Sequence, residues 1–188
     1  MSSIFSEESK FLVSRWQTVE KLDKDIQTLR YEFTQYLDSV RKILKKRNWW
    51  GDDLIFEQYR QEGIYIARKS WFIRKNDRYP AIWIGVEEFK PESMFGLGEP
   101  ADCYLWVFGK MLGKKADTVR NDLTRISEKN RGLKKYIYGK ENNQILYKPL
   151  PKYFNREYKA FIAGEPLRDA ADFIERTYLA IRKYKIKK

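Results

Sequence analysis

The feature that most constrains this chain is a stretch free of glycine and proline, from residue 6 to about residue 48, with apolar residues at heptad spacing. Two series of positions step by seven residues and are offset by three and four, which places them on one stripe of a long helix. The series are Leu12, Val19, Ile26, Phe33 and Val40, and Leu22, Leu29, Tyr36 and Ile43. The pattern predicts a helix whose stripe packs either on another chain, as a coiled coil, or along its own domain.

A straight helix of this length would be longer than a small domain is wide. The stretch holds about 43 residues, which at 1.5 Å per residue would span roughly 65 Å. We therefore expect the helix to project from the rest of the chain or to bend back on it. Gly51 is placed to act as its C-terminal cap, so residues 1–50 are predicted to be the long helix and residues 51–188 a single α+β domain.

The middle of the chain predicts a small antiparallel sheet. Asp52 and Asp53 can cap a short helix that runs through Gln61. Residues 63–74 and 81–89 are rich in Ile, Trp, Tyr and Phe and are separated by turn-forming residues, which indicates a hairpin. A third strand is expected over residues 101–108.

The remainder of the chain is predicted to return to helix. Residues 116–130 carry a helical apolar stripe, and residues 133–138 and 144–148 are typical of a second, basic hairpin. A last helix is expected from about Pro166. The predicted fold class is therefore α+β: a long heptad-patterned N-terminal helix, a small antiparallel β-sheet with helices on one face, a basic helix-hairpin unit and a C-terminal helix.

The absence of histidine excludes many enzyme classes. Catalytic pairs and triads with an imidazole, and zinc sites with histidine ligands, cannot be built from this chain alone. The single Cys103 excludes an intrachain disulfide and a cysteine-only metal site, and its apolar surroundings predict a buried side chain. No cofactor is expected. One cysteine and the lack of a membrane-length apolar run favour a cytoplasmic protein without a membrane partner.

Positive charge is concentrated at one end of the 188-residue chain, which has a net charge of +12. Basic and acidic residues number 10 and 7 in residues 1–50, 8 and 10 in residues 51–113, and 20 and 9 in residues 114–188. The excess thus lies almost wholly in the last segment, at +11. An uncompensated basic surface favours a nucleic-acid partner. The alternative is a lysine-rich surface that is only exposed to solvent, which would have the same excess of positive charge.

Basic and aromatic residues alternate within this last segment, a combination suited to phosphate contact and base stacking. The alternative for its tyrosines is cross-strand packing within the hairpin. The candidate nucleic-acid-binding residues are Lys114, Lys115, Arg120, Arg125, Lys129, Arg131, Lys134, Lys135, Tyr136, Tyr138, Lys140, Tyr147 and Lys148.

One arrangement suggests catalysis instead. Asp77 is followed eleven residues later by Glu88-Phe89-Lys90, a spacing that resembles the Asp…Glu-x-Lys core of the PD-(D/E)XK nucleases over about 14 residues. The resemblance implies that Asp77 and Glu88 would bind Mg²⁺ while Lys90 helps to activate water. The alternative is an exposed strand edge.

Three functions remain open on the sequence. The leading hypothesis is a non-catalytic nucleic-acid-binding protein, binding DNA or RNA, with a helix for self-association or partner binding. The second is a Mg²⁺-dependent nuclease resting on Asp77, Glu88 and Lys90. The third is an effector or inhibitor that binds another protein. A homodimer or a protein partner is expected to use residues 12–44.

Overall fold

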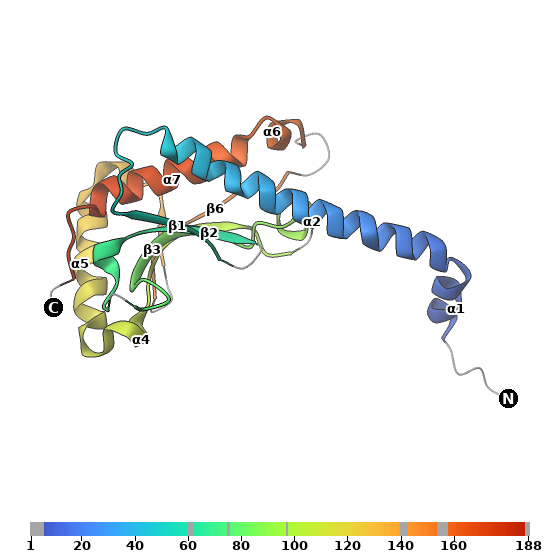
Figure 1. The fold of residues 1–188 in the computed structure, drawn as a ribbon, viewed down its shortest axis with the longest axis horizontal. Helices are drawn as coiled ribbons and strands as arrows, with labels where there is room; N and C mark the ends of the chain where they lie inside the picture. The colour runs from blue at the N-terminus through green and yellow to red at the C-terminus, as the bar shows by residue number, and fades with distance from the viewer. Residues whose placement is uncertain are drawn as a thin grey trace.

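A six-stranded antiparallel sheet forms the centre of the computed structural model, which describes residues 6–59, 62–74, 76–96, 98–139, 143–153 and 158–186. Its strand order is β1-β2-β3-β4-β6-β5, and every neighbouring pair is antiparallel. The strands are β1 (Leu54–Tyr59), β2 (Gly63–Arg68), β3 (Ile82–Glu87), β4 (Asp102–Val107), β5 (Ile137–Tyr138) and β6 (Gln144–Pro149). Together with the helices, the sheet confirms the predicted α+β class (Figure 1).

The N-terminal stretch forms two helices, α1 (Glu7–Ser14) and α2 (Trp16–Lys45), with a break at Arg15. Figure 1 shows that α2 lies over the sheet with its C-terminal half and projects beyond the sheet with its N-terminal half. The long helix was therefore predicted correctly, but its expected end at Gly51 was wrong. The helix ends at Lys45. The backbone N–H groups of Lys46 and Arg47 donate to the carbonyls of Ile43 and Leu44 and close the last turn.

Strand β1 lies where a short helix over residues 52–61 was expected, so that prediction was wrong. Each residue of β1 pairs with β2, from Leu54 opposite Arg68 to Tyr59 opposite Gly63. A helix here would have left the edge of β2 without backbone partners. Asp53, expected to cap the helix, instead accepts hydrogen bonds from the guanidinium of Arg68, with its Oδ2 atom 2.7 Å from Nε and 2.6 Å from Nη2.

The longest helices cover one face of the sheet. Helix α7 (Glu165–Ile181) packs against α2 and the sheet, and α5 (Ala116–Lys129) packs against α7, β4 and β6. Side chains that oppose one another across the strands and point into this layer are Ile66, Ile84, Leu105 and Leu146, all fully buried. The core thus lies between the sheet and these helices, which agrees with the expected single covered face.

The opposite face of the sheet is aromatic. Trp83 and Trp106 oppose each other on β3 and β4, and Tyr65, Gly85, Tyr104 and Tyr147 form a row across four strands. Their rings contact one another: Trp83 lies 5.7 Å from Tyr65 and 6.3 Å from Trp106, centroid to centroid. Packing among neighbouring strands therefore accounts for these aromatic side chains.

Short elements connect these layers. They are η1 (Lys69–Trp71), α3 (Pro91–Phe95), α4 (Gly109–Leu112), η2 (Gly113–Lys115), η3 (Arg131–Leu133) and α6 (Tyr158–Ile162). Helices α5 and α7 begin within a residue of their predicted starts. Within the described ranges, no helix combines the length and the apolar character needed to cross a membrane.

Candidate nucleic-acid interface

A basic groove follows the chain after α7. It consists of three adjoining hollows of about 250, 170 and 410 Å³, all of which are lined by Ile186. Its walls come from η1 and the loop after it, from α4, and from the first turns of α5. We call this surface the C-terminal groove; the residues that line it are Lys69, Ser70, Phe72, Ile73, Arg74, Met111, Leu112, Lys115, Thr118, Val119, Asp122, Tyr184, Lys185 and Ile186.

Specific contacts hold the chain end in place beside the groove. The indole Nε1 of Trp71 donates to the carbonyl oxygen of Tyr184 at 3.2 Å, and the hydroxyl of Tyr184 donates to Asp122 at 3.4 Å. Arg68 donates to the carbonyl oxygen of Arg182. Because Trp71 is fully buried, the segment that carries Lys185 is fixed to the core rather than left as a fraying tail.

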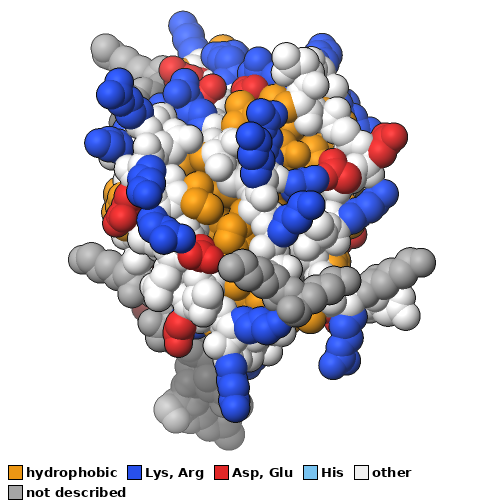
Figure 2. Space-filling model, turned by 90° about the vertical axis from the view of Figure 1, so that its left-hand side faces the viewer, with side chains coloured by type: hydrophobic (Ala, Val, Ile, Leu, Met, Phe, Trp, Pro, Cys, Tyr) orange, Lys and Arg blue, Asp and Glu red, His pale blue; other side chains and the backbone are white. Residues whose placement is uncertain are grey.

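Positive charge dominates the lining of the groove. The side chains of Lys69, Arg74 and Lys185 form no ion pair with any described residue, whereas Asp122 is 2.9 Å from Nη2 of Arg125. Burial and the nearby Asp122 carboxylate raise the pKa of Tyr184 to about 12, so this hydroxyl stays neutral and able to donate. Figure 2 shows the side of the molecule where the chain ends, with many more Lys and Arg than Asp and Glu side chains.

Helix α5 extends the basic surface away from the groove. Lys115 and Lys129 are fourteen residues apart, close to four helical turns, so they lie on the same side of α5 and roughly 21 Å apart. Lys129 is exposed, as are Lys114, Arg131 and Lys134. A surface of this length can contact several successive phosphates of one strand.

Three of the predicted nucleic-acid-binding residues make contacts within the protein instead of facing the solvent freely. Tyr136 is buried, with its ring 4.7 Å from that of Phe173, and Nζ of Lys148 is 3.0 Å from Asp169 of α7 on the covered face of the sheet. Arg120 is half-buried and 3.5 Å from Asp117. Tyr136 therefore packs against helix α7, which is neither base stacking nor the cross-strand packing that was the alternative, and Arg120 and Lys148 form ion pairs within the chain.

The remaining candidates differ in their exposure. Arg125 and Lys135 are exposed, the first paired with Asp122 and the second with its ammonium 5.2 Å from the ring centre of Tyr136. Tyr138 and Tyr147 are half-buried. Lys140 lies outside the described residues. Residues 133–136 form the end of η3 and a turn rather than a strand, so the paired part of this hairpin is shorter than expected.

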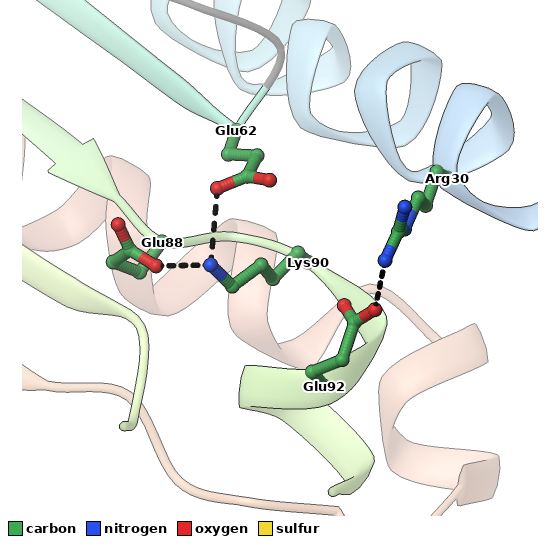
Figure 3. A network of polar contacts seen from close by, with 5 residues as sticks. All are labelled: Arg30, Glu62, Glu88, Lys90 and Glu92. Atoms are coloured by element: carbon green, nitrogen blue, oxygen red, sulfur yellow. Dashed lines mark hydrogen bonds and ion pairs between the residues drawn. The ribbon is translucent and has the colours of Figure 1, made fainter. Parts of the chain in front are cut away.

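Of the three nuclease-like residues, Glu88 and Lys90 contact each other, and Asp77 has a partner of its own in the turn after η1. Asp77 accepts a hydrogen bond from the backbone N–H of Arg74 at 2.7 Å, whereas Nζ of Lys90 contacts the carboxylates of both Glu88 and Glu62 (Figure 3). In the part of the chain that the structure describes, no three Asp, Glu, Cys or His side chains are close enough to hold a metal ion. Figure 3 shows instead an ion-pair network in which Arg30 of α2 contacts Glu92 of α3.

Three of the four groove cations, Lys69, Arg74 and Lys185, were not among the candidates selected from the sequence. Lys69 and Arg74 lie in the segment that precedes β3, which belongs to the acidic middle of the chain, so segment charge sums gave no reason to select them. The available signal is local: residues 68–78 carry five basic residues and one acidic residue, Asp77. The fold carries two of them, Lys69 and Arg74, to the basic C-terminal segment.

Cys103 is fully buried on β4, as the sequence predicted. Burial raises the pKa of its thiol well above the usual range, which keeps it in the unreactive neutral form.

The geometry defines an α+β protein with one helix-covered sheet face and a basic groove at its chain end. No protein-family model matches the sequence, and neither a curated protein nor a solved structure shows significant similarity to it.

Proposed function

We propose that the protein is a non-catalytic nucleic-acid-binding protein that contacts the phosphate backbone through the C-terminal groove. The observation that carries the proposal is the convergence of Lys69, Arg74 and Lys185, three cations without an ion pair among the described residues, on adjoining hollows. Cations that are not neutralised within the protein attract polyanions and gain affinity by counterion release.

The shape of the surface supports a strand of nucleic acid as the ligand. The hollows reach α5 as far as Asp122, and the exposed Lys129 lies further along the same side of the helix, so the cations follow a line rather than a single point. Phe72 and Met111 lie between them and offer apolar surface to a base or a sugar. Arg131 and Lys134 follow the C-terminal end of α5 and add two further cations beyond Lys129.

Binding can be measured by the fluorescence anisotropy of labelled single-stranded and double-stranded DNA and RNA. We expect an affinity that falls steeply between about 50 and 200 mM salt, with a slope near 0.9 per phosphate contact on duplex DNA. The triple variant Lys69→Glu, Arg74→Glu, Lys185→Glu should bind at least about tenfold more weakly and show a shallower salt slope.

A matched control separates the groove from net charge. The variant Lys21→Glu, Lys42→Glu, Lys45→Glu changes three exposed lysines of α2 and alters the net charge by the same amount. This control should keep most of the wild-type affinity. Equal losses of affinity in the two triple variants would mean that only the overall charge matters. If the wild type did not bind nucleic acid at all, the proposed function would be wrong and the basic residues would only be exposed to solvent.

A further inference from the structure

The N-terminal half of α2 carries an apolar stripe that its own domain does not cover. Residues 16–32, which we call the overhang, are exposed except for the half-buried Val19. Within it, Leu22 is 58% exposed, Ile26 38% and Leu29 39%. Ten of the twelve large apolar side chains that are exposed among the described residues lie on α1, α2 and α6, which is an unusual concentration for a free surface.

The stripe continues directly into the core. Positions 22, 26 and 29 are followed at the same spacing by Phe33, Leu37, Val40 and Leu44, which are buried against the domain. The uncovered stripe therefore points to the same side of α2 as the domain does, into the space beside the sheet that is empty in Figure 1.

A hollow of about 510 Å³ lies where the overhang joins the domain. Its walls are almost wholly apolar, with Leu29 and Phe33 on α2 and Phe161 and Ile162 on α6, and Glu32 at its edge. Ile162 is 70% exposed. We call it the α2–α6 hollow. The stripe and the hollow thus form one continuous apolar surface along a single helix.

We propose that this surface is covered by the overhang of a second copy of the chain, in an antiparallel pairing of the two α2 helices about a two-fold axis. A parallel pairing is disfavoured because each stripe faces the side of its own domain, so two parallel helices would bring both domains to the same place. An antiparallel pairing puts the two domains at opposite ends of the paired segment, and both copies then bury the same surface.

The heptad spacing sets the register of the pairing. Alternating layers form when Leu22 of one copy packs against Ile26 of the other, and Val19 against Leu29. In this register Arg15 of one copy comes level with Phe33 of the other. The chain bends at Arg15, so α1, with its exposed Phe11, Leu12 and Val13, is brought to the α2–α6 hollow. One register thereby covers both the stripe and the hollow.

Charges around the two-fold axis give the pairing a distinct salt dependence. At each end, Arg15 approaches Glu32 of the other copy, which is an attractive pair. At the centre, near residue 24, Asp23 and Asp25 each face their own equivalents, which repel. Because salt screens the two attractive end pairs as well as the two repulsive central pairs, we expect the affinity of the dimer to change little with added salt, in contrast to that of nucleic-acid binding.

The first test is the mass in solution, measured by light scattering over a range of concentrations after nuclease treatment. The wild type should approach about twice 22.7 kDa. The variant Leu22→Glu, Ile26→Glu should stay monomeric with an unchanged circular dichroism spectrum, since both side chains are exposed in the monomer. Tyr31→Glu, on the opposite side of α2 and 66% exposed, should still dimerise. A wild type that is monomeric at every concentration would overturn the proposal.

The second test fixes the orientation by disulfide formation. An equimolar mixture of Leu22→Cys and Ile26→Cys should cross-link between the two variants under mild oxidation, whereas each variant alone should cross-link poorly. Cys103 will not interfere, because it is fully buried. A parallel dimer would give the reverse result, with each variant cross-linking to itself, and would show the antiparallel register to be wrong.

Discussion

Nη2 of Arg30 on α2 lies 2.6 Å from Oε1 of Glu92 on α3, and this ion pair marks the point at which α2 leaves the domain. On one side of it, Phe33 and Leu37 are buried; on the other, residues 20–32 are all exposed. The hydrogen bond from Arg30 is the main cause that lowers the pKa of Glu92 below its usual value.

We expect this ion pair to position the helix more than it stabilises the fold. Both side chains are more than 40% exposed, so a double-mutant cycle with Arg30→Met and Glu92→Gln should give a coupling free energy of at most about 1 kcal/mol. Chemical denaturation of the four proteins measures it. A coupling of several kcal/mol would mean that the pair is shielded from solvent, contrary to the structure.

The two halves of α2 should respond differently to the same substitution. Leu37→Ala should lower the free energy of unfolding by about 2 to 5 kcal/mol, because Leu37 is fully buried and leaves a cavity. Leu22→Ala, the matched change in the overhang, should cost less than about 1 kcal/mol in dilute solution, where the chain is monomeric. Equal losses would place the overhang inside the cooperative fold.

Gly85 should be intolerant of a side chain. A Cβ atom there would lie 2.4 Å from the carbonyl oxygen of Ile64 and 3.1 Å from Cβ of Tyr65, with Tyr104 in register on the other side. We expect Gly85→Ala to lower the free energy of unfolding by about 1 to 3 kcal/mol. Gly51→Ala is the control, since its nearest contact would be an ordinary 3.5 Å, and thermal melts of both variants make the comparison.

Asp102 should make stability depend on pH. Burial first, and then the charges of Glu99 and Glu87, raise the pKa of Asp102 to about 6, well above 3.8. The folded state holds this proton more tightly than the unfolded state. The protonated Asp102 carboxyl therefore contributes its full stabilisation below about pH 4, and this contribution is lost as the pH rises through about 6. At pH 8, Asp102→Asn should therefore raise the free energy of unfolding by about 1 kcal/mol, allowing for partial solvation.

The measurement for Asp102 is urea denaturation of both proteins from pH 4 to pH 8. The difference in stability between wild type and Asp102→Asn should grow across this range. A constant difference would show that the carboxyl titrates normally in the folded protein.

Local patterns predicted most elements of the fold because those elements are specified by near neighbours in sequence. The stripe on α5 and Pro166 near the start of α7 determine where those helices form, whatever they pack on. Strand β1 was missed for the opposite reason. Asp52 and Asp53 precede Leu54–Tyr59 and suit the start of a helix, and only the free edge of β2 makes this segment a strand.

The candidate site depended even more on distant contacts. Residue types in the last segment correctly indicated an excess of positive charge, but they could not say which cations remain unpaired. Lys148 pairs with Asp169, twenty-one residues away in sequence, and Tyr136 packs on Phe173. Lys69 and Arg74 come close to Lys185 through long-range contacts such as those of Trp71 with the carbonyl of Tyr184 and of Arg68 with that of Arg182.

By itself, the sequence determined most of the helical and strand segments but not strand β1, and it determined the single buried cysteine, the lack of histidine and the basic character of the C-terminal part. These follow from composition and periodicity, which act over a few residues. Tertiary structure alone decided which half of α2 joins the core and which cations meet in one groove. Those outcomes depend on long-range packing and ion pairing, whose free energy exists only once distant segments are brought together.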